Sequence, residues 1–79
     1  MPEGIEAIDQ HIEELREERV VFIHRGIRAR NEAQRLFSQD KLAYRQKQGE
    51  VIAYKERIIN IEERLKLLKK KRAGLFYDQ

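Results

Sequence analysis

The side chains in this chain that could carry chemistry are two histidines and a run of glutamates near the amino terminus. His11 and His24 lie about 220° apart around a helix, so they cannot hold one metal ion from the same helix face. The glutamates could attract a divalent cation, but they repel one another at i, i+4 spacing and are typical of a solvated surface: Glu13, Glu14, Glu17 and Glu18. We therefore expect no catalytic residue, no cofactor, no metal site and no small-molecule substrate, and we interpret the protein as a non-enzyme.

One family comparison rests on the spacing of residues near the amino terminus. The pattern resembles the opening helix of the small all-helical chorismate mutases, in which isoleucine, aspartate and spaced leucines precede an arginine: Ile5, Ile8, Asp9, Ile12, Leu15 and Arg19. That family also carries an earlier arginine, where this chain has Pro2. The resemblance therefore implies no pocket for a dicarboxylate substrate, and no active site is transferred from it.

Composition bounds the class of protein. The chain has 79 residues, which fits one small domain spanning 1–79, and a chain of this size cannot build a large private core. It contains no cysteine, one proline and 39% charged residues, a composition typical of long helices or coiled coils. The amino terminus shows no signal-peptide pattern, and no apolar run approaches the length of a membrane span. We expect a cytoplasmic protein with no membrane association.

Two heptad stripes indicate the helices. Apolar residues recur at alternating steps of three and four, as a helical seam requires. The first stripe is Ile5, Ile8, Ile12, Leu15, Arg19, Phe22, Gly26, Ala29, Ala33 and Leu36, and the second is Val51, Tyr54, Ile58, Ile61, Leu65, Leu68, Arg72 and Leu75. The second stripe, extended backwards, does not join the first in phase. We therefore predict a turn at about 37–40, between helices at about 3–36 and 41–73, with a tail at 74–79.

An antiparallel hairpin of these helices brings opposite charges together. Folding the chain about Ser38 matches four flanking pairs, Glu18 with Arg57, Arg25 with Glu50, Asp9 with Lys69, and Arg16 with Glu62. The turn also places the acidic segment 1–24, net −5, beside the basic end of the chain, while segment 25–49 has a net charge of +5. The fold class we predict is an all-α antiparallel helical hairpin.

Glycines leave two alternatives open. Gly26 and Gly49 each follow basic residues, which is also how helices end, so the chain could form a three-helix bundle. A single helix of about 110 Å is the third possibility. Near the carboxyl terminus, basic residues followed by Gly74 predict the end of the second helix near Ala73 with a left-handed cap. We expect Leu75, Phe76 and Tyr77 to dock back onto the last turn.

Some large apolar side chains lie outside the seam. They fall on one side of the hairpin, where folding places 20 beside 59 and 27 beside 52: Val20, Ile23, Ile27, Ile52 and Ile59. They could complete a private core, but contiguous apolar patches on soluble proteins usually mark contact sites. We predict a protein–protein interaction module that forms a homodimer, pairing into a four-helix bundle, or takes a helix of a partner protein into the same groove.

The turn end of the predicted hairpin is strongly basic. The residues concerned are Arg25, Arg28, Arg30, Arg35, Lys41, Arg45 and Lys47, with Phe37 and Tyr44 nearby as possible stacking groups. Such a cluster could select an acidic protein partner, and it could also bind the phosphates of a nucleic acid. The sequence carries no helix-turn-helix or zinc-finger pattern. Nucleic-acid binding is therefore the alternative function, behind protein–protein interaction.

Overall fold

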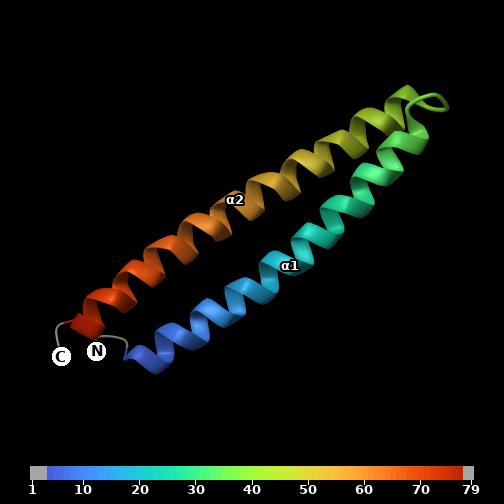
Figure 1. Ribbon diagram of the computed structural model, residues 1–79. Coiled ribbons are helices and arrows are strands. Elements are labelled where there is room, and N and C mark those ends of the chain that lie inside the picture. The colour runs from blue at the N-terminus through green and yellow to red at the C-terminus, as the bar shows by residue number, and fades with distance from the viewer. Residues whose placement is uncertain (1–3, 78–79) are drawn as a thin grey trace.

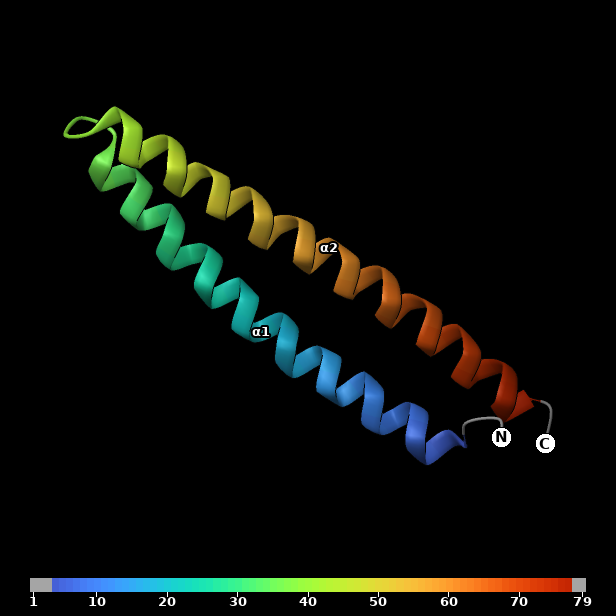
Figure 2. The same ribbon diagram turned by 180° about the vertical axis from the view of Figure 1, so that it is seen from behind.

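Two long helices make up the hairpin. The computed structural model describes residues 4–77, with side chains as far as Leu75. Helix α1 spans Ile5–Leu36 and helix α2 spans Lys41–Tyr77, and they pack side by side in opposite directions (Figure 1). The view from behind shows the same pairing along the whole rod, which is about 60 Å long (Figure 2). The predicted hairpin is confirmed, and the three-helix bundle and the single continuous helix are wrong.

The turn forms where the two heptad stripes fall out of phase. The backbone N–H groups of Gln39 and Asp40 donate to the Leu36 carbonyl, which closes the end of α1. Asp40 then opens α2, because its Oδ1 accepts hydrogen bonds from the N–H groups of Leu42 and Ala43, at 3.1 and 3.2 Å. A side chain that accepts from the first free amides of a helix is a typical N-cap. Asp40 therefore caps the amino terminus of α2.

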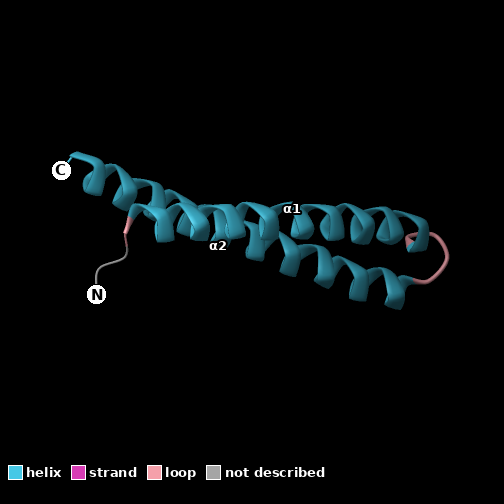
Figure 3. Cartoon of the chain, turned by 90° about the horizontal axis from the view of Figure 1, so that it is seen from below, coloured by secondary structure: helices cyan, strands magenta, loops and turns pink. Residues whose placement is uncertain are grey.

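The core follows the predicted seam. Within the described residues, each buried apolar side chain belongs to one of the two stripes: Ile8, Ile12, Leu15, Ala29, Ala33, Ile61, Leu65 and Leu68. The isoleucines and leucines form one cluster at the end of the rod away from the turn, with Phe22 and Leu75 packed against it. The two alanines lie in the half nearer the turn. Seen from below, the helices cross at a shallow angle, as heptad packing requires (Figure 3).

Glycines do not end helices here. Helix α1 runs through Gly26 and α2 runs through Gly49 and on past Gly74 to Tyr77, so the predicted end near Ala73 and the left-handed cap are wrong. A glycine in a helix interior costs about 1 kcal/mol relative to alanine, and packing of neighbouring side chains can offset this cost. Leu75 supplies such packing, because it lies against the core cluster. The side chains of Phe76 and Tyr77 are outside the described residues, as is the predicted helix start at residue 3.

Replacing Gly49 by alanine should stabilise the hairpin. A Cβ at this position would meet no atom within 4 Å, so the methyl group adds no clash. Alanine in a helix interior is favoured over glycine by about 0.5–1 kcal/mol, which corresponds to a rise of about 2–8 °C in the melting temperature of a chain this small. Thermal unfolding followed by circular dichroism measures the shift. A lower melting temperature would contradict the placement of Gly49 in the exposed interior of α2.

The ion pairs differ from the predicted ones by one helical turn. Asp9 pairs with Arg72 instead of Lys69, and Glu62 pairs with Arg19 instead of Arg16. The other two predicted pairs are replaced as well. Glu50 binds Lys47 on its own helix, and the Arg57 guanidinium lies over the ring of Phe22, 5.0 Å from its centroid.

The reason for the shift is that two arginines occupy positions within the seam itself. Arg19 and Arg72 both belong to the heptad stripes, where an unpaired charge would face apolar neighbours. Long side chains can place their stems along the seam and their charged heads at its edge. Each arginine does so and meets a carboxylate of the facing helix, so that this carboxylate is bound one helical turn away from its predicted partner.

Candidate interaction surface

The five aliphatic residues outside the seam remain largely exposed. We call them the aliphatic face: Val20, Ile23, Ile27, Ile52 and Ile59. Val20 and Ile27 on α1 keep 50% and 51% of their surface exposed, and Ile52 and Ile59 on α2 keep 57% and 53%. Ile23 is half-buried. No third helix within the described residues covers them, so the private-core interpretation of these residues is wrong for the isolated chain.

The aliphatic face is centred on a shallow groove between the helices. The groove has a volume of about 190 Å³, and its walls are mainly apolar: Ile23, Gly26, Ile27, Arg30, Val51, Tyr54, Lys55 and Ile58. It opens where Gly26, which has no side chain, faces Tyr54 across the seam. A Cβ on Gly26 would lie 3.7 Å from the Tyr54 Cβ. A methyl group at Gly26 would therefore be in ordinary van der Waals contact with Tyr54, and the two helices approach closely beneath the centre of the face.

Neighbouring grooves place the remaining members on the same side of the hairpin. Ile52 lines an adjoining groove together with Arg30 and Lys55, two residues that also line the central one. Val20 lines a third groove, with Arg16 and Lys66. Ile59 follows Lys55 by four residues and Ile52 by seven, so it shares their helix face. The structure therefore brings all five predicted residues to one side.

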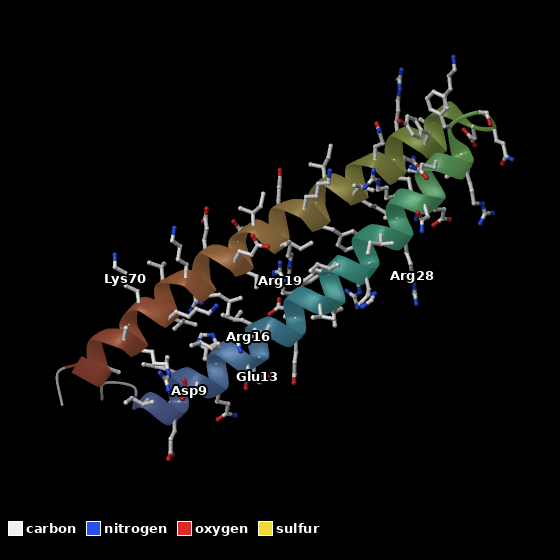
Figure 4. All side chains as sticks on the ribbon, in the orientation of Figure 1. Asp9, Glu13, Arg16, Arg19, Arg28 and Lys70 are labelled. Carbon is white, nitrogen blue, oxygen red and sulfur yellow. The ribbon has the colours of Figure 1, made fainter. Side chains whose placement is uncertain are left out.

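Charged side chains flank the aliphatic face toward the amino-terminal end of α1. Arg16 and Lys66 line the charged groove beside Val20, and Figure 4 shows Arg16 and Glu13 on neighbouring turns of α1.

Two ion pairs join the helices across the seam. Arg19 is tied to Glu62 by contacts of 2.9 and 3.0 Å. Arg72 is tied to Asp9, and this hydrogen bond and the attraction of the carboxylate raise the pKa of Arg72. The end of the hairpin away from the turn is thus closed by two exposed ion pairs.

Acidic side chains neutralise little of the positive charge at the basic turn end. Its two acids, Glu32 and Asp40, are both engaged: Glu32 pairs with Lys47 at 3.1 Å, and Asp40 caps α2. Lys47 also pairs with Glu50, and hydrogen bonds to Glu50 and Glu32 raise the pKa of Lys47, so it stays charged but is not available to a ligand. The other six predicted residues are exposed and have no acidic partner among the described residues: Arg25, Arg28, Arg30, Arg35, Lys41 and Arg45.

These six cations surround the rod and do not form one stripe. Arg28 points away from α2 in Figure 4, whereas Arg30 lines grooves on the side of the aliphatic face. The guanidinium of Arg25 lies 5.7 Å from the ring centroid of Phe22, and Arg25 lines a different groove, together with Arg28. At the tip, the rings of Phe37 and Tyr44 contact each other edge to face, with centroids 5.1 Å apart. Phe37 is thereby held in place although its surface is mostly exposed.

Sequence reasoning did not single out three other exposed aliphatic residues. Val21, Leu42 and Leu67 are all open to solvent, and Leu67 keeps 68% of its surface exposed. They break the heptad pattern as isolated residues, with no apolar partner at i+3, i+4 or i+7 on the same outward side. That absence of periodicity was the only signal in the sequence, and it marks them as scattered surface residues and not as part of the aliphatic face.

The described residues contain no group of three histidine, cysteine, aspartate or glutamate side chains that could hold a metal ion. Neither described helix has an apolar stretch that could cross a membrane. Comparison with known proteins found no matching family model, no matching curated protein and no matching solved structure.

Proposed function

We propose that this chain is a non-catalytic protein–protein interaction module that pairs with a second copy of itself through the aliphatic face, forming an antiparallel four-helix bundle. The observation that carries the proposal is the half-exposed state of Val20, Ile27, Ile52 and Ile59 on one side of the rod, around an apolar groove. Exposed apolar patches rimmed by charge are typical of contact sites. The function would be that of an adaptor, inhibitor or assembly factor.

The side of the rod that carries the aliphatic face is large enough for a dimer interface. The rod is about 60 Å long and 18 Å wide, so one side offers on the order of 1,000 Å² per copy. Standard protein interfaces bury about 800 Å² per partner. The aliphatic face itself covers only residues 20–27 and 52–59, about 10 Å of that length at 1.5 Å per residue. A second copy is favoured as the occupant because it can bring its own aliphatic face against this one and its charged side chains against Arg16 and Lys66 beside it.

Energies predict a weak association. Each side chain of the aliphatic face is already about half hidden, so its further burial contributes about 1 kcal/mol, and the ten side chains of two copies contribute roughly 10 kcal/mol. Association costs about 4 to 15 kcal/mol. The two terms are of similar size, and exposed ion pairs add little. We therefore expect association at micromolar concentrations or above, and not at nanomolar ones.

Sedimentation equilibrium over a range of concentrations tests the proposal. The single chain has a mass of 9.5 kDa, and the average mass should rise toward twice this value as the concentration approaches the high micromolar range. A constant mass of one chain would contradict self-association. In that case a helix of a different protein would remain the candidate occupant of the face, and a titration with an acidic, amphipathic helical peptide would test it.

A second candidate function is nucleic-acid binding at the basic turn end. It is favoured by one specific observation. Both acids of this region are engaged in a cap and an ion pair, while six cations have no acidic partner within residues 4–75. Phe37 and Tyr44 offer ring faces nearby. Cations spread around a tip would bind phosphates without reading sequence.

The salt dependence of binding distinguishes this second function. If all six cations contact phosphates of duplex DNA, the logarithm of the binding constant should fall with the logarithm of the salt concentration with a slope of about −5. Changing Arg28, Arg30 and Arg35 to glutamate should abolish this binding. A matched control reverses three charges at the opposite end of the rod, Lys66, Lys69 and Lys70, and should leave it largely intact. Binding that is absent at low salt would contradict the function.

A further inference from the structure

We propose that the second copy docks with its turn at the same end as the first, so that α1 of each copy lies against α2 of the other. The inference rests on the proposed self-association through the aliphatic face and adds the orientation of the partner. A twofold axis can bring the two faces together in two ways. In the parallel arrangement the axis runs along the rod, so α1 of one copy meets α2 of the second copy at the same level. In the opposed arrangement the axis crosses the rod, so α1 meets α1 and α2 meets α2.

Charges beside the aliphatic face are left unpaired by the hairpin. Arg16 and Lys66 line the groove next to Val20. Two carboxylates, Glu13 and Glu63, lie one turn from these cations along their respective helices. All four side chains are exposed, and none makes an ion pair with another described residue. They are therefore available to a second copy.

The parallel arrangement satisfies these charges. Residues at the same level of the hairpin have numbers that add to about 79, as in the ion pair of Glu32 with Lys47. Val20 then meets Ile59 of the second copy, and Ile27 meets Ile52. Continuing away from the turn in the same register, Arg16 meets Glu63 and Lys66 meets Glu13. Each of these contacts occurs twice, so the aliphatic face and four ion pairs are matched in one register.

The opposed arrangement does not satisfy them. Centring the axis on the aliphatic face again gives apolar contacts, because Val20 meets Ile27 and Ile52 meets Ile59. Extending this register brings Lys66 opposite Arg45, which is a like-charge contact, and Arg16 opposite Asn31, which is neutral. Like charges that face each other across an interface disfavour it. The order of charges along the rod therefore selects the parallel arrangement.

Ion pairs of the same kind already join the two helices across the seam of the hairpin. Arg19 and Arg72 occupy seam positions and bind flanking carboxylates of the facing helix, Glu62 and Asp9. Arg16 and Lys66 lie outside the seam but next to Val20 of the aliphatic face, and in the parallel arrangement they meet the carboxylates Glu63 and Glu13 of the second copy. The second seam would thus repeat the charge pattern of the first. A consequence is that both basic turn ends lie together at one end of the dimer.

The distance between spin labels on the two turns tests the orientation. The chain has no cysteine, so Ser38→Cys in the exposed turn gives a single labelling site. Helices packed about 10 Å apart place the two labels roughly 20 to 30 Å from each other in the parallel arrangement. In the opposed arrangement the turns lie about 45 Å apart, at 1.5 Å per residue from the centre of the face. Dilution with unlabelled protein should remove the short distance, which identifies it as intermolecular.

The possible outcomes separate this inference from the proposed function. A dimer by sedimentation with a distance near 45 Å would overturn the orientation and leave self-association standing. A labelled protein that stays monomeric at every concentration, as the unlabelled protein also does, would overturn both. If only the labelled protein failed to associate, the label would be moved to Gln39→Cys in the same turn, where the same two distances apply.

Discussion

Ile27→Asp should abolish self-association while leaving the helices folded. Ile27 keeps half of its surface exposed in the hairpin, so a carboxylate there can remain hydrated in the single chain. In the bundle the same carboxylate would be buried against Ile52 of the second copy without a partner, which costs several kcal/mol. We expect the dissociation constant to rise at least a hundredfold, measured by sedimentation equilibrium, with the helix signal in circular dichroism unchanged. Ile52→Asp should act in the same way.

Val21→Asp is the matched control for this variant. Val21 lies on the same helix and is similarly exposed, but it does not line any groove of the aliphatic face. The same charge is introduced on the outward side of α1, so association should remain within about threefold of the wild-type value. Equal losses in both variants would mean that association depends on the net charge or on the outward surface, and the aliphatic face would lose its assigned role.

Leu65→Ala should cause the largest loss of folding stability. Leu65 is buried in the core cluster between Ile61 and Leu68. Truncating a buried leucine typically lowers the free energy of unfolding by 2–5 kcal/mol. At about 0.05–0.15 kcal/mol per residue, a chain of this size has a total of roughly 4 to 12 kcal/mol. The variant should therefore lose a large share of its stability, seen as a lower urea midpoint in circular dichroism.

Leu67→Ala makes the same chemical change two residues along on the same helix. Leu67 is mostly exposed, so its truncation should change the free energy of unfolding by no more than about 0.5 kcal/mol. Comparable losses at Leu65 and Leu67 would contradict the seam that defines the hairpin. Both variants should be measured at low concentration, because dimer formation would otherwise add to the apparent stability.

The sequence predicts the seam well because heptad spacing reports directly on burial. All buried residues between Gly4 and Leu75 fall in the two stripes, and the turn lies where the stripes lose phase, at Asp40 and its neighbours. These features are local, since each depends on residues a few positions apart. The five members of the aliphatic face were also found from the same spacing, and they reach one side of the rod because the two helices run antiparallel.

The ion pairs across the seam could not be predicted exactly, because they depend on how far side chains reach across it. Pairing flank with flank assigned Asp9 to Lys69, but Arg72 reaches out of the seam to the same carboxylate. A heptad pattern does not show how far an arginine side chain can reach. The end of α2 was missed for a similar reason. Gly74 is a permissive residue, and the packing of Leu75 on the core decides that the helix continues.

Methyl NMR spectra recorded across a dilution series test most directly whether the aliphatic face is the docking surface. If it is, the methyl signals of four of its residues should shift with concentration: Ile23, Ile27, Ile52 and Ile59. The signals of Ile8, Ile12 and Ile61, which are buried within the hairpin, should stay constant. Signals of the aliphatic face that do not move while the sedimentation mass doubles, or shifts centred on Leu42 and Leu67 instead, would contradict it.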